Sequence, residues 1–293
     1  MIGRFTILAA ATFFCLLSCD HAHAPAAFAS ALDTGSSWAT RVSAEQTLTQ
    51  SMGGRDIEAR QSFSTTYRFT VLGRDPGGAL SMEAVYEGLS LRISSPLGTW
   101  SFDSSGAVDP ESRFAALRAL VGGRFTFSLG PDMSVRDLGG LSELAARIAA
   151  AARNPILAAS ASSWMNEAAM RSSLEAMFSL FPSGKIAVGQ NWNVSSSPGG
   201  GMPVVAHNTI TATKVSGDKM SATIDGRIEG AGEGGSAELR GKQDGSVDLD
   251  RARLRILGGG VSQDLVGSVM VSGTKVPITV HSVISFDSVD VVK

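Results

Sequence analysis

Asp33-Thr34-Gly35-Ser36-Ser37 places a carboxylate in a setting typical of acid–base catalysis. Aspartic proteases need two such carboxylates, which share one proton between them. The nearest candidate for the second, Asp103-Ser104-Ser105-Gly106, has one residue too many. The first motif also lacks the apolar strand that should precede it. We therefore interpret it as part of a polar segment and expect no protease activity.

Gly230-Ala231-Gly232-Glu233-Gly234-Gly235 has the glycine spacing of a dinucleotide-binding turn. Such a turn must open a helix whose N-terminus meets the pyrophosphate. Here the residues that follow, Ser236–Lys242, alternate like a strand, and Glu233 would repel a phosphate. We expect a hairpin loop at this place, and we expect no cofactor.

The four histidines are too scattered in the sequence to build a metal site. His21 and His23 lie near the N-terminus, whereas His207 and His281 fall in separate expected strands. No cysteine occurs beyond residue 19 to complete a ligand set. The net charge is −2 and no cluster of Lys and Arg is present, which argues against binding to nucleic acid. We expect no metal site, no nucleic-acid partner and no enzymatic activity.

The N-terminus has the features of a bacterial export signal. Arg4 supplies a positive charge, and the apolar run Phe5–Leu17 that follows is shorter than the about 20 residues of a membrane-spanning helix. Such a run fits the apolar part of a secretory signal peptide. Leu16-Leu17-Ser18-Cys19 then resembles a lipobox, in which the cysteine thiol is lipidated and becomes the new N-terminus. We predict a signal peptide over residues 1–18 and a lipid anchor at Cys19.

The sequence also allows a second mode of signal-peptide cleavage. Ala27-Phe28-Ala29 and Ala29-Ser30-Ala31 have the small-residue spacing of a cleavage site that leaves no lipid, although both lie well beyond the apolar run. The lipidated product would be anchored on the periplasmic side of a membrane, and Asp20 would retain it at the inner membrane where the enteric sorting rule applies. The other product would be a soluble periplasmic or secreted protein.

Alternation of apolar and polar residues predicts strands through most of the remaining chain. One such series is Phe63, Thr65, Tyr67, Phe69 and Val71. In the run Leu80–Ile93 the alternation changes phase at Gly88, which indicates a bulge. Turns rich in Gly, Asp, Ser or Pro are predicted at residues 75–78, 130–132, 216–218, 244–246 and 272–274. Strands joined by turns this short must pair antiparallel.

The middle of the chain changes to the period of a helix. One apolar stripe comprises Leu141, Leu144, Ala145, Ile148 and Ala152, and Asn154-Pro155 predicts a new helix start. A second stripe comprises Met170, Leu174, Met177, Phe178 and Phe181. We predict a flexible tether over residues 19–36 and a single domain over residues 37–293. Its fold class is mainly β (α+β), a large curved antiparallel sheet or half-barrel with a central two-helix insert, at about residues 141–181, covering one face.

The second stripe is also the candidate lining of a ligand site. Methionine side chains are flexible and adapt to apolar partners, and Met165, Met170 and Met177 share this segment with Trp164. Core packing is the alternative interpretation. The residues that would line a site for an apolar ligand are Met170, Leu174, Met177, Phe178 and Phe181.

Several segments resemble an uncharacterised bacterial exported family, domain of unknown function 6263. They are Val85-Tyr86-Glu87-Gly88-Leu89-Ser90-Leu91, Trp100-Ser101-Phe102-Asp103-Ser104, Leu120-Val121-Gly122-Gly123 before Phe125-Thr126-Phe127, Gly130-Pro131-Asp132, Gly139-Gly140-Leu141, Leu180-Phe181-Pro182 and Val188-Gly189-Gln190-Asn191-Trp192. The resemblance would cover most of residues 38–290, and it implies no catalytic or binding residues. The pattern is also similar in architecture to the half-barrels of periplasmic lipoprotein carriers, by analogy alone.

Two functions are consistent with this sequence. The first is an exported cell-envelope lipoprotein that binds or carries an apolar small molecule such as a lipid. The second is a non-catalytic structural or protein-interaction module of the cell envelope, whose protein partner the sequence does not identify. A ligand held between sheet and helices would distinguish the first from the second.

Overall fold

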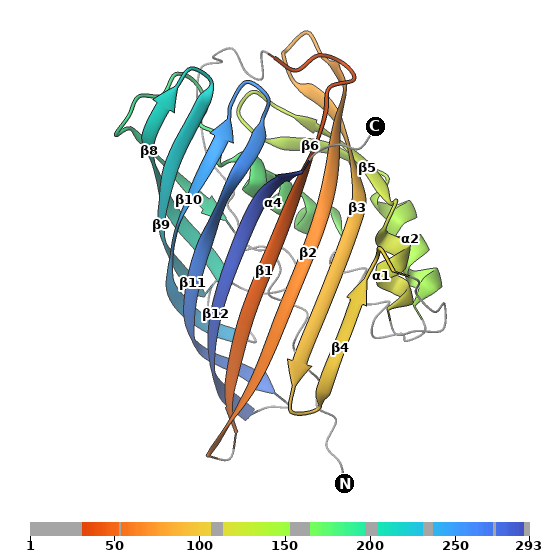
Figure 1. The fold of residues 1–293 in the computed structure, drawn as a ribbon, viewed down its shortest axis with the longest axis vertical. Coiled ribbons are helices and arrows are strands. Elements are labelled where there is room, and N and C mark those ends of the chain that lie inside the picture. Colours follow the sequence, from red (N-terminus) through yellow and green to blue (C-terminus); the bar gives the residue numbers. More distant parts are fainter. Residues whose placement is uncertain are drawn as a thin grey trace.

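The computed structural model describes residues 31–52, 54–106, 114–152, 165–196, 204–230, 237–271 and 274–289. In these residues the chain forms a single sheet of twelve antiparallel strands together with three helices (Figure 1). None of the three helices has the length and apolar character that crossing a membrane would require. The predicted fold class is confirmed.

The strands fall into two groups on either side of the helices. Before and among the helices lie β1 (Ser37–Met52), β2 (Arg55–Arg74), β3 (Leu80–Ser95), β4 (Gly98–Asp103), β5 (Arg124–Leu129) and β6 (Val135–Gly139). The helices are α1 (Ala115–Leu120), α2 (Leu141–Ala151) and α4 (Glu167–Phe178). After them come β7 (Asn191–Ser196), β8 (Val204–Ser216), β9 (Lys219–Gly230), β10 (Ala237–Asp250), β11 (Arg255–Val271) and β12 (Thr274–Val289).

The first and last strands pair in the middle of the sheet. The strand order is β6-β5-β3-β2-β1-β12-β11-β10-β9-β8-β7, with β4 paired to β3 beside this path. The chain therefore runs outward from β1 to one edge at β6. It reaches the opposite edge at β7 by way of the helical segment, and then returns strand by strand to β12. This order makes the helices the connection between the two edges.

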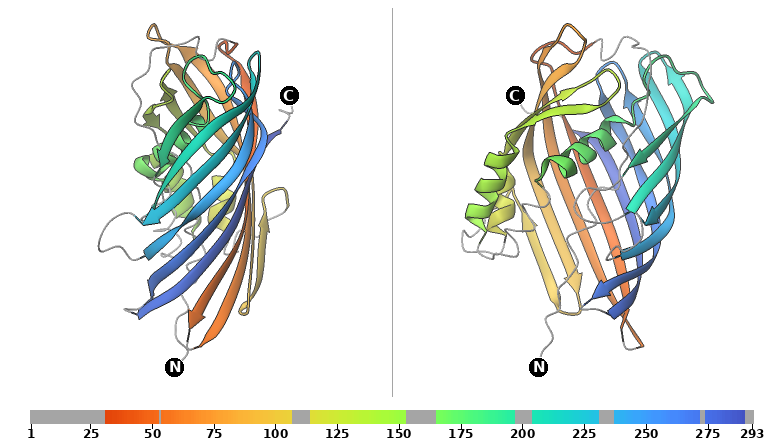
Figure 2. Two further views of the ribbon diagram at one scale, coloured as in Figure 1. Left: turned by 90° about the vertical axis from the view of Figure 1, so that its left-hand side faces the viewer. Right: turned by 180° about the vertical axis from the view of Figure 1, so that it is seen from behind.

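The sheet is curved (Figure 2), and its two faces differ in chemistry. In β12 the side chains at every second position from Val276 to Phe286 are buried, and those between them are exposed or, at Ser285, half-buried. The predicted series from Phe63 to Val71 in β2 points to the same inner face, since Phe69 and Val71 are fully buried. The pairing register shifts at Gly88, as the change of phase predicted. The inner face is therefore apolar for most of its area, and the outer face is largely polar.

Inward-facing glycines allow the strands of the second group to approach closely. A Cβ atom at Gly241 would lie 1.9 Å from the backbone oxygen of Asp264, and one at Gly267 would lie 1.8 Å from that of Glu238. No side chain fits at such distances, so these positions require glycine. Glycines placed in this way let a sheet bend sharply, which explains the strong curvature of β10 and β11.

Helix α4 links the two edges of the open sheet. At one edge the backbone N–H of Val135 in β6 donates to Glu175 at 3.1 Å, and Arg171 donates to the carbonyl of the same residue. At the other edge Trp192 Nε1 in β7 donates to the carbonyl of Ser179, the C-cap residue, at 3.3 Å. The helix begins at Asn166, whose side chain accepts from the N–H of Ala169 at 2.8 Å, a standard N-cap. In the right-hand view of Figure 2, α4 lies across the concave side.

The other two helices lie beside the sheet, next to β3 and β5 (Figure 1). Helix α2 buries Leu141, Leu144 and Ile148, the stripe that its period predicts. Helix α1 was not predicted, because six residues are too few to establish a helical period. The two predicted stripes are confirmed as helices, except that Ala152 and Phe181 follow the last residues of α2 and α4. Helix α4 is the one that spans the concave face. The predicted helix start at Asn154-Pro155 lies outside the described residues.

Two details of the expected strand map differ from the structure. Residues 244–246 were predicted to form a turn, but they lie inside β10, and the chain turns instead at residues 251–254. Residues 31–36, the described part of the expected tether, are held against the sheet. Gly35 donates to the carbonyl of Val71 at 2.8 Å, and Leu32 is buried in the core. Residues 19–30 of the expected tether lie outside the described residues.

Candidate functional site

Two separate clusters of apolar side chains lie on the inner face. The first cluster contains the apolar residues of α4 together with inner residues of most strands, among them Phe69, Phe127 and Phe286. The second cluster comprises Val204, Ala206, Ile228, Leu239, Leu265, Val269, Val276, Ile278 and Val280, with Leu48 packed against it. Its members are buried, and none of them belongs to a helix of the described part of the chain.

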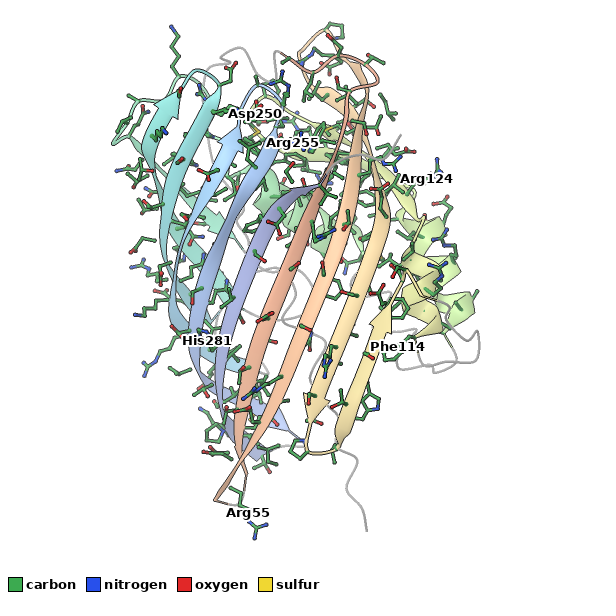
Figure 3. All side chains as sticks on the ribbon, viewed as in Figure 1. Arg55, Phe114, Arg124, Asp250, Arg255 and His281 are labelled. Atoms are coloured by element: carbon green, nitrogen blue, oxygen red, sulfur yellow. The ribbon has the colours of Figure 1, made fainter. Side chains whose placement is uncertain are left out.

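The two clusters occupy opposite ends of the sheet. Figure 3 labels Asp250 and Arg255 at the end where α4 lies, and Arg55 in the hairpin between β1 and β2 at the other end. The second cluster lies toward the Arg55 end, because Val276 and Val269 pair with each other close to the hairpin that joins β11 and β12. The three helices contribute side chains to the first cluster.

A row of polar side chains crosses the inner face between the two clusters. It consists of Gln46, Ser282, Gln263, Gln243 and Asn208, and we call it the polar row. Gln46 is paired with Ser282, Ser282 with Gln263, and Gln263 with Gln243. Gly226 in β9 stands between Gln243 and Asn208. The row therefore follows a single line of register across neighbouring strands.

Both flanks of the polar row are apolar. On the α4 side the next inward residues include Val261, Ile224 and Ile210, which belong to the first cluster. On the Arg55 side they include Leu265 and Ile228, which belong to the second. Every member of the polar row is at most 9% exposed. The row is thus a buried polar boundary within an otherwise apolar surface.

Hydrogen bonds give the polar row a direction. Gln263 Nε2 donates to Gln243 Oε1 at 2.7 Å, and Gln243 Nε2 in turn donates to Asn208 Oδ1. Gln46 Nε2 donates to Ser282 Oγ at 3.1 Å. Such chains of amides polarise one another, so the last donor of a chain is strengthened. That last donor is Asn208 Nδ2, which is buried and has no hydrogen-bond partner.

An unpaired amide donor is costly where Asn208 lies. Asn208 is 2% exposed, and a buried donor without a partner costs about 1–3 kcal/mol. Gly226 leaves room for this amide, since a Cβ atom there would lie 1.9 Å from Asn208 Oδ1. Native proteins leave few such groups unpaired, and each one calls for an explanation.

The five predicted lining residues on and after α4 are all buried in the first cluster. Phe178 packs against Phe69 at 5.7 Å and against Phe127 at 5.9 Å between ring centroids. Met170, Leu174, Met177 and Phe181 are 3–5% exposed. The structure brings all five together between helix and sheet. Their role as ligand lining stays a prediction.

Tyr86 is buried in the first cluster, and the partly buried Tyr67 packs against it with ring centroids 4.8 Å apart. Burial raises the pKa of Tyr67 to about 12, although a hydrogen bond with Tyr86 opposes this rise. Burial also raises the pKa of Tyr86 well above its usual value. Both hydroxyls stay protonated at neutral pH, so this pair acts as a hydrogen-bonded part of the core and offers no base.

Glu175 is the carboxylate that α4 places against the sheet edge. Its partial burial raises the pKa of the carboxyl, while the N–H of Val135 and the charge of Arg171 act in the opposite direction. Because Glu175 Oε1 accepts from the Val135 N–H, it serves to fasten the helix to β6. This arrangement positions α4 against the sheet edge.

The described histidines lie apart on the outer face. His207 Nδ1 is 3.0 Å from Ser195 Oγ, and His281 Nδ1 is 2.8 Å from Asp264 Oδ1. Within the described ranges, His, Cys, Asp and Glu nowhere form a group of three that could hold a metal ion. His21 and His23 lie outside the described residues, as do Cys19 and Asp20.

The two sequence motifs considered first take ordinary structural roles. Asp33 opens a tight turn in which its backbone N–H donates to Ser36 Oγ at 3.0 Å. The glycine-rich segment after Gly230 is followed by β10, which pairs antiparallel with β9. A dinucleotide turn would need a helix at that place, so the hairpin interpretation is confirmed for the flanking strands. The loop residues 231–236 themselves lie outside the described residues.

The polar row is the feature that sequence reasoning missed. A signal for it exists, because Gln263 stands in the inward phase between Val261 and Leu265, and Asn208 stands between Ala206 and Ile210. A single amide side chain among the inward-facing apolar residues of one strand does not indicate a site. Only the register of neighbouring strands shows that these amides form one line.

The family model for DUF6263, described as a family of unknown function, matches residues 77–253, which is more than half of the chain. The chain belongs to this family. The DUF6263 match begins in the turn before β3 and ends in the turn after β10, so it includes all three described helices. No curated protein matches the chain.

Among solved structures, this DUF6263 chain is similar to lipovitellin, in a structure titled for its lipid–protein interactions. The TM-score is 0.50 at 8% identity, over 88% of this chain and 25% of the lipovitellin chain. The chain thus spans about a quarter of that protein's length, and the likeness is one of fold alone.

Two further solved structures are less similar. A DUF1329 family protein from Desulfovibrio piger matches with a TM-score of 0.12 at 11% identity, over 88% of this chain and 87% of that chain. The outer membrane protein OpdK from Pseudomonas aeruginosa matches with a TM-score of 0.13 at 8% identity, over 87% of this chain and 98% of that chain. These two scores are too low to show a common fold.

Proposed function

We propose that this protein is a non-catalytic, exported cell-envelope lipoprotein that binds or carries an apolar ligand such as a lipid. One observation carries the proposal: the inner face holds a second, buried apolar cluster to which no described helix contributes a side chain. The likeness in fold to lipovitellin supports a sheet of this kind as a surface for lipid.

The two ends of the sheet differ in what covers their apolar inner face. An apolar sheet face must be covered, and helices are the usual cover for a sheet of this type. At the α4 end Phe178 and Leu174 supply that cover and leave the sheet packed by protein side chains. At the Arg55 end the inner residues, such as Leu265 and Ile278, have no such helical counterpart. We assign ligand binding to this second end.

The alternative is a structural or interaction module of the envelope. The aromatic contacts of Phe178 with Phe69 and Phe127 favour it, because they show that the α4 end is densely packed. Under this alternative the ligand would be absent and the whole inner face would serve stability.

Native mass spectrometry of the purified mature protein tests the proposal. We expect a species heavier than the polypeptide by one or more lipid masses, which returns to the polypeptide mass after organic extraction. The extracted protein should take lipid up again from phospholipid vesicles. A protein that carries no lipid when purified and takes none up from vesicles would favour the structural module.

The lipid anchor at Cys19 is proposed from the sequence, and one detail of the structure disfavours one of its two rival cleavage sites. The rival site after Ala31 would place a charged amino group on Leu32, which is 6% exposed and belongs to the first cluster. Burying an unpaired charge is costly, so cleavage at that bond is disfavoured. The protein would then lie on the periplasmic side of a membrane, at the inner membrane where Asp20 acts as a retention signal.

Cys19→Ala tests the anchor directly. We expect the wild-type protein to sediment with membranes and to begin at a diacylated Cys19, and the variant to accumulate as precursor or to appear in the soluble fraction. Cys15→Ala is the matched control, since it removes the other cysteine and should change nothing. A wild-type N-terminus at Ser30 or Leu32 would contradict lipidation.

A further inference from the structure

We propose that one corner of the α4 end is a docking surface for the anionic phospholipid bilayer that holds the lipid anchor. We call it the basic corner, and it consists of residues 184–190 before β7, residues 214–219 around the β8–β9 hairpin and residues 250–255 between β10 and β11. Figure 3 labels Asp250 and Arg255 within it. This inference rests on the lipid anchor at Cys19 in the proposed function, and it adds the part of the protein that faces the membrane.

Arg251 joins the three segments of the basic corner. Its backbone N–H donates to the carbonyl of Asp218 at 2.8 Å, and its Nη2 donates to the carbonyl of Gly217 at 3.1 Å. Its Nη1 donates to the carbonyl of Gly184 at 3.4 Å. Because these bonds hold the three segments together, charges that are dispersed in the sequence gather at one place in the fold.

The basic corner is positively charged in a chain whose net charge is −2. Its basic residues are Lys185, Lys214, Lys219, Arg251, Arg253 and Arg255, and its acidic residues are Asp218 and Asp250. The three lysines are exposed, and none of them forms an ion pair with another described residue. Asp33 and Asp248, which flank the corner, offset only part of its charge. A surface of this kind attracts anionic lipid headgroups.

The start of the described chain places the anchor beside this corner. The N–H of Ala31 donates to the carbonyl of Ala252 at 3.3 Å. Ala31 comes twelve residues after Cys19, and twelve residues span at most about 40 Å. The 16 residues of β1, which runs from the α4 end to the Arg55 end, extend for about 50 Å. A molecule standing on its Arg55 end would therefore hold Ala31 beyond the reach of its own anchor.

The basic corner also offers an apolar side chain to the bilayer. Val188 is 64% exposed, the highest value for a large apolar side chain among the described residues. The N–H of Gly189 donates to the carbonyl of Ala212 at 2.7 Å, and Ile186 packs against the first cluster, so the backbone on both sides of Val188 is fixed to the fold. An exposed apolar side chain among cationic ones suits a membrane interface, where the cations attract headgroups and the apolar group enters between them.

Fluorescent labels at three positions of the mature lipoprotein test the inference. Cys19 is the one natural cysteine that remains after removal of residues 1–18, and its thiol is lipidated, so an NBD maleimide reacts only with an introduced cysteine. Val188→Cys reports on the basic corner, Leu97→Cys on the Arg55 end and Val283→Cys on the outer face. All three positions are exposed, so none of these changes disturbs the core.

The labelled proteins are reconstituted through their anchor into vesicles of phosphatidylethanolamine and phosphatidylglycerol. We expect the NBD emission at position 188 to move to shorter wavelength and to be quenched by spin-labelled phospholipid, because the label enters the interface. The labels at positions 97 and 283 should show neither change. Vesicles of phosphatidylcholine alone should abolish the response at position 188.

Two sets of charge changes in the Val188→Cys protein test the lysines. The first set removes three charges from the corner and comprises Lys185→Gln, Lys214→Gln and Lys219→Gln. A basic residue at an anionic surface contributes about fivefold to the ratio of docked to undocked protein, so this set should eliminate the spectral shift. The matched control removes three charges from exposed positions elsewhere and comprises Arg92→Gln, Arg240→Gln and Lys242→Gln. It should leave the shift in place.

The outcomes separate this inference from the proposed function. No response at position 188, an equal response at all three positions, or a response at position 97 alone would overturn docking by the basic corner while the anchor stands. A shift that persists on phosphatidylcholine or without the three lysines would overturn the anionic surface as the partner. A mature protein without lipid at Cys19 would refute the anchor and this inference together. Absence of a carried ligand would refute only the carrier function.

Discussion

The α4 end and the Arg55 end of the sheet are built from the same strands, yet their apolar inner faces are buried in different ways. At the α4 end, Phe178 packs into the aromatic residues Phe69 and Phe127. At the Arg55 end, an equally buried surface has no helical residue in its cluster. The polar row separates the two. Under the proposed function, one continuous strand serves as packed core along one half and contributes to ligand binding along the other.

The largest effect is expected from Phe178→Ala at the α4 end. Phe178 is 1% exposed, and truncation of a buried phenylalanine costs about 3–5 kcal/mol in unfolding free energy. Chemical denaturation of the purified protein measures this loss. Val283→Ala, at a position 45% exposed on the outer face, is the control and should lie near the wild type. A small loss at Phe178 would mean that this end is not a packed core.

A matched pair of leucines compares the two ends directly. Leu174 and Leu265 are 3% and 4% exposed and lie in the first and the second cluster. We expect Leu174→Ala to cost about 2–5 kcal/mol and Leu265→Ala about 1–2 kcal/mol in delipidated protein, because a ligand surface loses fewer protein contacts. Added lipid should stabilise the wild type more than Leu265→Ala. Equal losses without any effect of lipid would remove the distinction between the two ends.

Gly267→Ala tests whether close strand approach shapes the Arg55 end. The added methyl would meet the backbone oxygen of Glu238 at 1.8 Å, so the strands must separate, at a cost of about 1–3 kcal/mol. Gly73→Ala is the control, since nothing lies within 4 Å of a Cβ atom there. The melting temperature should fall for Gly267→Ala alone. Equal melting temperatures would show that curvature does not depend on this glycine.

The smallest effect concerns Glu175, which fastens α4 to β6. Because the folded state raises the pKa of its carboxyl, the folded state favours the protonated form. Its stabilising contribution is fully present below the ordinary pKa of 4.5 and is lost as the pH rises through the folded value. Glu175→Gln keeps an acceptor for the Val135 N–H and removes this dependence. The stability of the variant relative to the wild type should therefore increase from pH 4 to pH 7, and an opposite slope would contradict the assignment.

Local periodicity was sufficient to predict the fold class and most elements. The alternation around Phe69 and the stripe of Leu174 and Phe178 are each set by residues close in sequence, and burial of one face follows from them. β1 (Ser37–Met52) was not predicted as a strand, since the inward phase of this strand includes the polar residues Thr40 and Gln46. The turn expected at residues 244–246 was wrong. The sequence of these residues is typical of a turn, but they lie inside β10, where Gly245 lets the neighbouring strand approach closely.

The candidate site could not be predicted in the same way. Gln46 and Ser282 meet through a pairing of strands from opposite ends of the chain, and no local pattern encodes such a meeting. The sequence directed attention to the methionines near α4, which the structure places in the packed end. A polar residue at one inward-facing position of a strand does not predict a site. Its neighbours on the paired strands must be known first.

The central pairing of β1 with β12 also has a consequence for how the molecule assembles. Ala39 pairs with Val289 and Gln50 with Ile278, so the middle of the sheet joins the most distant parts of the chain. Contacts of such high sequence separation form slowly, because a long loop must close before they are gained. Each half can form its hairpins early, but β1 must wait with an unpaired edge until the last strand has been synthesised. Exposed edges of this kind invite association between chains. Loss of the final strand would therefore open the sheet at its centre and leave two aggregation-prone halves.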